Sequence, residues 1–504
     1  GGWVAFATYI ERITNSRQTL IFLSNASNGS ARRYLHQVLK GEPYTLPQTE
    51  LITNVSLIDG TGALARPANL RIVNNRIDDL GDNLRPFPNE VVTNGGGQTL
   101  APGFIDSHSH LGESLLEKPQ ALAAVSQGIT TIISGQDGGS DPIDTLADHY
   151  RKQPAAINMA TYTGFGSLRE QYMHGETNRA ANWAELANMK AALRKDIQKG
   201  SLGLSTGLEY EAEFYAPTNE VIEMAKAASG MGGRYISHIR SEDLRIEDAI
   251  EEIIQIGREA KIPVQISHFK IAMWSKWGQS NDILTRLEQA RTEGINITAD
   301  CYPYTMWSST PRVLFPKKDF TNPLAAQFAV TQLIDPTKSV ITHFKPDPAI
   351  EGKTLSAIGD MKNESPADAL LRIIRVAEEN KTGASIVGVS MGEYDIKNFL
   401  RWNYTNICSD GGDGGHPRGY GAFTRVLGKY VREDKIMPLE TAIYKMTALT
   451  AEQTGIDNRG ILQAGYFADL VLFDPATVKD NATISDSRAL STGISKVWVN
   501  GKLV

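Results

Sequence analysis

Hydrophobic and polar positions divide the chain into a middle region and two flanks. In residues 51–81, LITNVSLIDGTGALARPANLRIVNNRIDDLG, apolar and polar side chains alternate between Gly and Asn turns, which is typical of half-buried antiparallel strands. The C-terminal segments GYFADLVLFDP and ISKVWVNGKLV show the same alternation around an Asn-Gly turn. We therefore predict that residues 46–100 and 461–504 pair into one small β-sandwich domain built from both flanks.

The middle region, residues 101–460, alternates short β-branched runs with helical patterns such as EEIIQIGREA and NDILTRLEQAR. Strands that alternate with helices indicate an α/β fold with a parallel sheet. Eight such units fit a (β/α)8 TIM-like barrel. The eight candidate strands are GFIDSHSH (103–110), ITTIIS (129–134), INMATYT (157–163), SLGLST (201–206), RYISHI (234–239), PVQISHF (263–269), INITADCY (295–302) and TNICSD (405–410).

The connection between the seventh and eighth runs, residues 311–404, is too long for a simple crossover. It contains Pro-rich pieces and a helical pattern of its own, SPADALLRIIRVAEE. We expect this segment to be an inserted lid subdomain near the active face of the barrel.

The composition narrows the classes of function. The 504 residues carry 51 Lys and Arg against 57 Asp and Glu, a formal net charge of −6. Nucleic-acid binding needs a basic surface, so we expect no such partner. No apolar stretch approaches the roughly 20 residues that span a bilayer, so we expect no membrane span. With only two cysteines, Cys301 and Cys408, any metal ion would be held mostly by histidines and carboxylates.

Four of the nine histidines and one aspartate lie at predicted strand ends. His108 and His110 are two residues apart and so share a face, while His238, His268 and Asp410 close the fifth, sixth and eighth runs. Barrels place their active sites at these carboxyl ends. A single histidine there is more often a hydrogen-bonded core residue, but the joint placement favours a metal centre. The histidines away from these ends are taken as structural: His36, His149, His174 and His343.

Ordered motifs give the chain a family resemblance. The APGFIDSHSH start, the strand-end histidines, the SDG motif and the split β-domain resemble the metal-dependent amidohydrolase superfamily. The series GLSTGLEYE, SHIRSED, ISHFK, DCYPY and HPRGYGAFTRVLGKYVRE resembles the N-acyl-D-amino-acid deacylase (D-aminoacylase) family across residues 51–504. An HxH pair alone is a weak motif, whereas this ordered series is specific.

The resemblance implies a metal centre with one or two divalent ions, zinc by expectation. His108, His110 and Asp410 would form one half-site, and His238 and His268 the other. The family commonly supplies a cysteine in a GNCG motif, but this chain reads GQDG. The metal residue in that place would be Asp137. A carboxylate is a harder ligand than a thiolate, so metal identity and number stay open, as does a loop role for this aspartate.

The mechanism that the resemblance implies is amide hydrolysis, with Asp410 as general base and then general acid. A free substrate carboxylate would suit two cations near the rim, Lys270 and Arg418. The family also uses a tyrosine and a serine for this carboxylate, here Tyr304 and either Ser308 or Ser309, because YTMWSST is one residue longer than the family spacing. A further aromatic residue on the acyl side would be Tyr210.

We therefore expect a metal-dependent hydrolase that releases a carboxylate and a D-amino acid from N-acyl-D-amino acids. The D configuration comes from the resemblance alone. Three alternatives stay open: a dipeptidase on peptides that contain D-amino acids, a cyclic amidase on the same metal site, and a non-catalytic binding module. The acyl group, side-chain preference and oligomeric state stay open as well.

Residues 1–45 read as two strands, GGWVAFATYIERI and TLIFLSN, and a helix, SARRYLHQVLKG. This segment resembles the C-terminal end of a serine β-lactamase or penicillin-binding protein, without the part that carries the nucleophile. It is too small to fold alone, so we interpret it as a remnant of a β-lactamase-like domain at the tail of a longer chain. Such an upstream domain would be compatible with an exported or periplasmic protein, and the compartment stays open.

Overall fold

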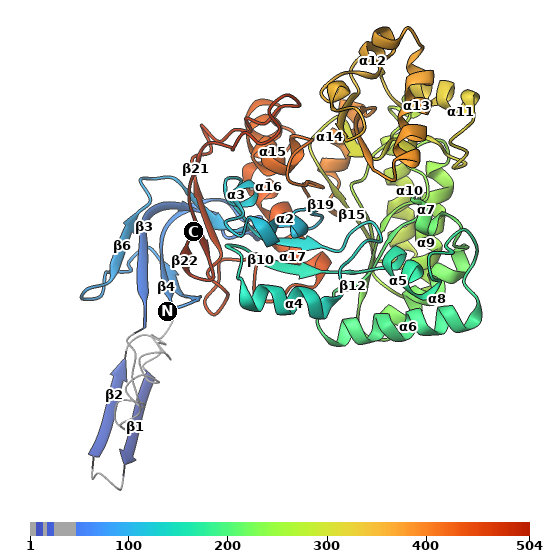
Figure 1. The fold of residues 1–504 in the computed structure, drawn as a ribbon. Helices are drawn as coiled ribbons and strands as arrows, with labels where there is room; N and C mark the ends of the chain where they lie inside the picture. The colour runs from blue at the N-terminus through green and yellow to red at the C-terminus, as the bar shows by residue number, and fades with distance from the viewer. Residues whose placement is uncertain (1–6, 14–17, 25–46) are drawn as a thin grey trace. The chain divides into compact units, whose positions relative to one another are not determined.

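The computed structural model describes residues 7–13, 18–24 and 47–504 (Figure 1). The chain divides into two compact units, Gly1–Thr49 and Glu50–Val504. In the first unit, strands β1 (Ala7–Ile13) and β2 (Gln18–Ser24) pair antiparallel, with Ala7 opposite Ser24. The two predicted strands are therefore present. The helix predicted over residues 30–41 lies outside the described residues.

The two flanks of the larger unit meet in one eight-stranded sheet, of order β22-β21-β20-β7-β3-β4-β5, with β6 beside β3. Antiparallel pairing of Leu470 with Pro102 joins the C-terminal flank to the N-terminal one. Alternate side chains, such as Leu70, Ile72 and Trp498, form its buried core. The pairing of the flanks is thus present as a single sheet, and its arrangement as a sandwich stays a prediction. The strands are β3 (Thr49–Leu57), β4 (Arg66–Val73), β5 (Arg76–Gly81), β6 (Val91–Asn94), β7 (Thr99–Pro102), β20 (Leu470–Phe473), β21 (Ile494–Val499) and β22 (Lys502–Leu503).

The middle region forms two parallel sheets whose strand order follows the chain, β10-β9-β8 and β11-β12-β13-β14-β15-β19. Each of the eight predicted runs contains a strand, and Tyr162 divides the third run into two short ones. Several of these strands are buried along their whole length, as expected for parallel strands covered on both faces. The strands are β8 (Phe104–Asp106), β9 (Ile129–Ser134), β10 (Asn158–Thr161), β11 (Thr163–Gly164), β12 (Gly203–Gly207), β13 (Arg234–His238), β14 (Val264–Ile266), β15 (Ile297–Cys301) and β19 (Thr405–Ile407).

The first and last of these strands lie side by side beyond their carboxyl ends. Ser109 and Gly411 form a parallel bridge, and the amide of Asp410 donates to the carbonyl of His108 at 2.8 Å. The buried carboxylate of Asp106 accepts from the amide of Ser409 at 2.8 Å and from its hydroxyl at 2.5 Å. These bonds bring the SHSH and SDG motifs together.

Amphipathic helices connect the strands. In α9, for example, Ile246, Ile250, Ile253 and Ile254 are buried while the acidic positions face outward. None of the helices in the described residues combines the length and apolar character of a membrane span. The helices outside the long insertion are α2 (Gly112–Glu117), α3 (Leu122–Val125), α4 (Ile143–Lys152), α5 (Phe165–Tyr172), α6 (Trp183–Gln198), α7 (Glu211–Phe214), α8 (Thr218–Ser229), α9 (Ile246–Ala260), η1 (Trp274–Lys276), α10 (Ser280–Thr292), α14 (Glu393–Arg401), α15 (Arg418–Arg425), η5 (Val426–Glu433), α16 (Leu439–Met446) and α17 (Ala448–Thr454).

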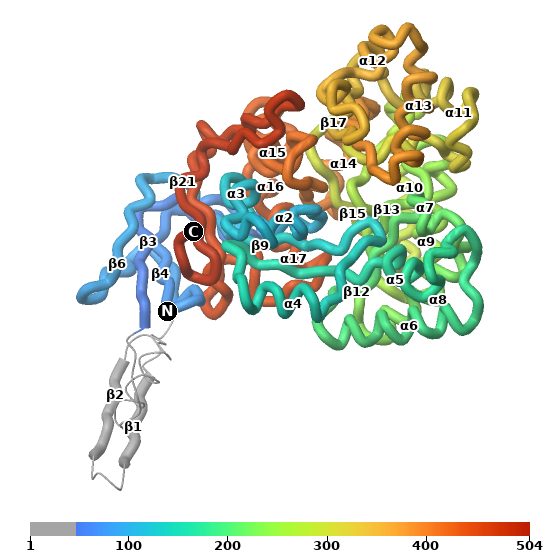
Figure 2. Tube along the Cα trace, in the orientation of Figure 1, coloured from blue at the N-terminus to red at the C-terminus, as the bar shows by residue number. Residues whose placement is uncertain are grey.

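The long insertion builds a three-stranded antiparallel sheet of order β16-β18-β17. Figure 2 shows its segments α11, α12, α13 and β17 lying together. Its boundaries differ from the predicted 311–404. It begins with β16 at Met306, and α14 packs instead on α10 and β19, with the Phe399 ring stacked on Phe269 at 4.0 Å. The elements are β16 (Met306–Ser309), η2 (Pro311–Leu314), α11 (Pro323–Phe328), η3 (Ala329–Leu333), β17 (Val340–Phe344), η4 (Pro348–Ile350), α12 (Leu355–Lys362), α13 (Pro366–Glu379) and β18 (Ala384–Val389).

A fully buried arginine, Arg169 on α5, ties three segments together. It is ion-paired with Glu220 of α8 and donates to the carbonyls of Ala212 at 2.7 Å, Thr177 at 2.9 Å and Arg179 at 2.6 Å. Arg169→Met would leave a buried carboxylate without its cation. We expect it to lower the free energy of unfolding by about 3–5 kcal/mol, measured as a lower urea midpoint.

The matched control is Arg151→Met. This arginine pairs with Asp148 on the surface, where the two side chains are 72% and 63% exposed. An exposed pair contributes less than about 1 kcal/mol, so the urea midpoint should hardly move. Equal shifts for the two variants would contradict the role assigned to Arg169.

Candidate metal centre

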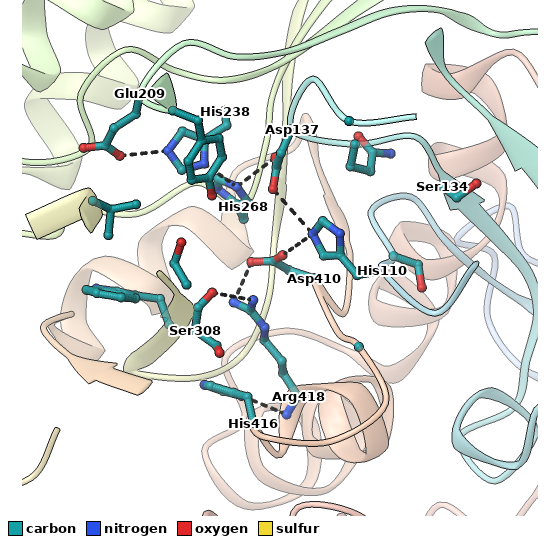
Figure 3. A pocket seen from close by; sticks show the side chains of 18 of the residues that line it. His110, Ser134, Asp137, Glu209, His238, His268, Ser308, Asp410, His416 and Arg418 are labelled. Carbon is teal, nitrogen blue, oxygen red and sulfur yellow. Dashed lines mark hydrogen bonds and ion pairs between the residues drawn. The ribbon is translucent and has the colours of Figure 1, made fainter. Parts of the chain in front are cut away.

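Six predicted residues converge where the parallel strands end, and Figure 3 shows all of them except His108. Their side chains come from five different strand ends and point toward one another. The residues are His108 and His110 after β8, Asp137 after β9, His238 at the end of β13, His268 after β14 and Asp410 after β19.

Two carboxylates stand at the centre of the imidazoles. Asp137 Oδ1 lies 3.5 Å from His108 Nε2 and 3.3 Å from His268 Nε2, while its Oδ2 lies 3.4 Å from His110 Nε2. Asp410 Oδ1 lies 3.2 Å from His110 Nε2 and 3.6 Å from His108 Nε2. A tetrahedral zinc ion with bonds of about 2.0–2.1 Å spaces its ligands about 3.3 Å apart. The donor spacing therefore fits such an ion.

Unpartnered atoms in this cluster also fit a metal ion. Both ring nitrogens of His108 and the Oδ1 atom of Asp137 are buried and have no hydrogen-bond partner in the described part of the chain. Buried polar atoms are almost always bonded, so such atoms need an explanation. A divalent cation held by these nitrogen and oxygen donors would supply one.

His268 belongs to two groups of potential ligands. One comprises His108, Asp137, His268 and Asp410, and the other comprises His238, Glu242 and His268. Its Nε2 atom lies 3.0 Å from His238 Nδ1 as well as 3.3 Å from Asp137 Oδ1. The expected division into two half-sites, with His268 in the second alone, is therefore too simple.

Backbone geometry explains why these side chains meet. Asp137, His268 and Asp410 have φ angles of 54°, 36° and 49°, a left-handed conformation that is uncommon outside glycine. Such strain persists only where the surroundings fix it, and it collects at functional sites. Gly138 next to Asp137 has a φ of 77°, and a Cβ there would lie 1.6 Å from Glu213 Oε1. The second glycine of GQDG is thus required for both conformation and space.

The charges in the cluster are strongly coupled. Burial alone would raise the pKa of Asp410, but Arg418, whose Nη1 lies 2.5 Å away, and the histidines hold it well below its usual value. Burial likewise opposes ionisation of Asp137, and the imidazoles outweigh it and lower its pKa. Burial and Lys270 would lower the pKa of His268, yet the surrounding carboxylates raise it to about 10. The ionised carboxylates thus favour positive charge among the imidazoles.

A cavity of about 740 Å³ opens over the cluster. The insertion contributes apolar wall residues, including Trp307, Val313, Leu314 and Leu333. His108 is fully buried beneath it. The predicted site residues that line the cavity are His110, Asp137, Tyr210, His238, His268, Lys270, Ser308, Ser309, Asp410 and Arg418.

Both predicted cations reach the cavity, and both are ion-paired. Lys270 Nζ lies 2.6 and 2.7 Å from the two carboxylate oxygens of Glu242. Arg418, the first residue of α15, pairs with Asp410 and donates to the carbonyl of Ser308 at 3.3 Å. Lys270 lies four residues beyond the end of β14 at Ile266, so a turn of the chain and not the strand brings it to the cavity.

The structure does not bring Tyr304 to the cavity, which corrects the expectation for this residue. Its side chain is buried, with the guanidinium of Arg425 4.8 Å from the ring centre. A Cβ on Gly421 of α15 would lie 2.7 Å from the tyrosine hydroxyl. The chain turns after β15 ends at Cys301, so this side chain packs on α15.

Among the lining residues that were not predicted, three contact the cluster or its cation: Glu209, Glu242 and His416. Glu209 Oε2 lies 2.8 Å from His238 Nε2, and Glu242 Oε1 lies 2.9 Å from His268 Nδ1. His416 Nδ1 accepts from the amide of Arg418 at 3.0 Å. All three stand in the quoted motifs GLEYE, SHIRSED and HPR. For the two glutamates, the available signal was an acidic residue just beyond a strand end.

Comparison with known proteins agrees with this site. Residues 408–504 match the Amidohydrolase family (Amidohydro_3). The chain is 35% identical to a D-aminoacylase of Alcaligenes xylosoxydans xylosoxydans over 478 residues, which cover 90% of this chain and 93% of the relative. It is 36% identical to the N-acyl-D-aspartate deacylase of the same organism over 482 residues, covering 90% and 91%.

A solved relative has the same fold. It is the N-acyl-D-glutamate deacylase of Bordetella bronchiseptica, solved with zinc and a phosphonate mimic of the tetrahedral intermediate. The TM-score is 0.81 at 32% identity, over 90% of this chain and 96% of that one. The fold is that of a metal-dependent amidohydrolase. At this identity over nine-tenths of its length, the chain belongs to the N-acyl-D-amino-acid deacylase (D-aminoacylase) family.

Proposed function

We propose that this chain hydrolyses the amide bond of N-acyl-D-amino acids, releasing a carboxylate and a free D-amino acid, with zinc as its divalent ion. One observation carries the proposal. Four imidazoles and two carboxylates converge beneath a cavity of about 740 Å³, on a chain whose relatives are named as D-aminoacylase and N-acyl-D-aspartate deacylase.

The residues that would hold metal are those of the cluster. Imidazole nitrogens and carboxylate oxygens suit zinc. A bound divalent ion supplies a Lewis acid for the acyl oxygen and makes water a nucleophile at neutral pH. The number of bound ions depends on whether His268, which belongs to both groups of potential ligands, serves one ion or two separate ions divide the remaining donors. The proposed ligands are His108, His110, Asp137, His238, His268 and Asp410.

Asp410 is placed to move the proton. Its Oδ1 atom faces His110 and His108, while its Oδ2 atom is ion-paired with Arg418. We assign it the role of taking the proton from the attacking water and then giving it to the departing amine nitrogen. One carboxylate therefore serves as general base and general acid.

Substrate recognition is assigned to the cations and hydroxyls of the cavity. Lys270 and Arg418 would share their charge with the substrate carboxylate, beside Ser308 and Ser309. Tyr210, whose ring centre lies 4.6 Å from that of His238, would face the acyl side. The apolar residues of the insertion would pack against the rest of the substrate.

The architecture proposed for this function is a closed (β/α)8 barrel, residues 101–460, made from the two parallel sheets. The bridge between Ser109 and Gly411 supports closure. Residues 46–100 with 461–504 would be the small β-sandwich, and residues 1–45 the β-lactamase-like remnant. The insertion would act as a lid, since Trp307 and Leu333 line the cavity.

A dipeptidase acting on peptides with a C-terminal D-residue is the second candidate. Three cavity carboxylates, Glu113, Asp141 and Asp243, have no ion-pair partner among the described residues. They would suit the free α-amine of an aminoacyl group, which an N-acetyl group lacks.

A substrate panel tests the proposal. Zinc-loaded protein should hydrolyse N-acetyl-D-amino acids and leave the L-enantiomers almost untouched. Dipeptides with a C-terminal D-residue, if hydrolysed faster than every N-acyl substrate, would favour the second candidate. A protein with verified zinc content that hydrolyses neither class would contradict both.

Lys270→Met tests carboxylate recognition. We expect kcat/KM for N-acyl-D-amino acids to fall about 10- to 100-fold, because a hydrogen bond to a charged group contributes about 1.5–3 kcal/mol. The same substrate with its carboxylate converted to an amide should show little difference between the two proteins. An equal loss on both substrates would refute the assignment of Lys270 to the carboxylate.

A further inference from the structure

Two glutamates hold the outer ring nitrogens of two clustered histidines. Glu209 Oε2 lies 2.8 Å from His238 Nε2, and Glu242 Oε1 lies 2.9 Å from His268 Nδ1 (Figure 3 shows the first pair). Both glutamates are buried. An ionised carboxylate only accepts hydrogen bonds, so each glutamate favours the tautomer whose outer nitrogen carries the ring hydrogen.

The inner nitrogens then face each other. A neutral imidazole has one N–H, so His238 Nδ1 and His268 Nε2 would both present lone pairs, and they are 3.0 Å apart. Two lone pairs at this distance repel unless a proton or a metal ion lies between them, and in the metal-bound centre the divalent ion would take that place. Asp137 Oδ1, 3.3 Å from His268 Nε2 and without a hydrogen-bond partner in the described residues, points into the same space.

We propose that Glu209 and Glu242 are positioning residues that fix the tautomers of His238 and His268 and thereby raise the affinity of the centre for its divalent ion. This inference rests on the metal centre of the proposed function. Carboxylates behind ligating histidines commonly change metal affinity by about 10- to 100-fold.

The surroundings of Glu242 favour this role over direct ligation. Both its oxygens accept from Lys270, at 2.6 and 2.7 Å, so the lysine holds the carboxylate against the ring of His268. Lys270 Nζ also lies 2.7 Å from His268 Nδ1, to which its ammonium group can donate in the other tautomer but from which it cannot accept a hydrogen. When His268 binds metal through Nε2, its Nδ1 carries the hydrogen, and of these two neighbours only Glu242 can accept it.

The ion pair between Lys270 and Glu242 restricts which glutamate variants can be tested. Removing Glu242 alone would leave a buried cation unpaired and would endanger folding. Glu209 is not ion-paired with a lysine or arginine of the described chain, so Glu209→Leu is the cleaner variant. For Glu242 the comparison is the wild type with the double variant Lys270→Met/Glu242→Leu, which removes both charges of the buried pair.

The measurement is the zinc affinity of each protein, prepared free of metal and titrated in competition with a chelator of known affinity. Circular dichroism of the metal-free proteins verifies that they fold. Glu209→Leu and the double variant should each bind zinc about 10- to 100-fold more weakly than the wild type. Glu209→Gln should keep most of the affinity, because its amide oxygen still accepts the hydrogen bond.

Asp141→Asn is the matched control. It removes a charge from the same cavity at a residue that is hydrogen-bonded to no histidine of the cluster, so zinc affinity should be unchanged. A folded Glu209→Leu protein with wild-type affinity, or a Gln variant as weak as the Leu variant, would overturn the inference. No substrate enters the assay, so failure of the deacylase proposal would leave this result intact.

Discussion

Asp410→Asn is expected to lower kcat on N-acyl-D-amino acids by about 10²- to 10⁴-fold while the protein still binds metal. This is the range that a positioned general acid or base contributes. The amide cannot take a proton from water, although its oxygen can still face His108 and His110. Steady-state kinetics and metal analysis on the same preparation provide the measurement.

The control lies three residues along the chain. Asp413 is ion-paired with Lys118 and accepts from the Tyr420 hydroxyl at 2.5 Å, outside the cluster. Asp413→Asn should therefore keep nearly all of its kcat. An Asp410→Asn protein with full metal content and undiminished hydrolysis would show that the proton moves by another group.

Asp137→Ala is expected to weaken zinc binding by more than about 100-fold and to lower activity with it. Removing only a hydrogen-bond partner of a ligand can cost 10- to 100-fold, and Asp137 contacts three imidazoles, those of His108, His110 and His268. Zinc titration and turnover at limiting zinc measure the effect.

Asp137→Cys separates the ligand role from a loop role. A thiolate binds zinc well, so this variant should keep much of the affinity that the alanine variant loses. If Asp137→Ala bound zinc like the wild type, Asp137 would be an ordinary loop residue. Alanine and cysteine both lack the tolerance of aspartate for the left-handed conformation at position 137, so backbone strain cannot account for a difference between these two variants.

Local patterns were enough to predict the parallel strands. Each of the eight β-branched runs contains a strand. A parallel strand covered on both faces buries every residue, as β12 and β15 do, so a short continuous apolar run is enough to recognise it. The end of the insertion was missed for the opposite reason. The apolar stripe of α14, with Ile396 and Phe399, looks like that of any helix, and only its packing on α10 and β19 assigns it to the crossover.

The cluster of six residues was predictable from strand direction, because each of them lies at a strand end or within a few residues beyond one. His238 ends β13, so its place followed from the carboxyl end of a strand. Beyond the ends of β14 and β15 the chain turns, so the alternation of a strand no longer predicts which way a side chain points. The ion pair of Lys270 with Glu242 and the packing of Tyr304 on α15 could therefore not be predicted from residue spacing.

The most direct test of the account is anomalous diffraction at the zinc edge from crystals of the zinc-loaded, active protein. The account predicts a peak among the strand-end side chains, about 2.0–2.2 Å from donors of Asp137, His238 and His268. Active crystals with no peak in this cluster, or with their zinc bound elsewhere, would contradict it.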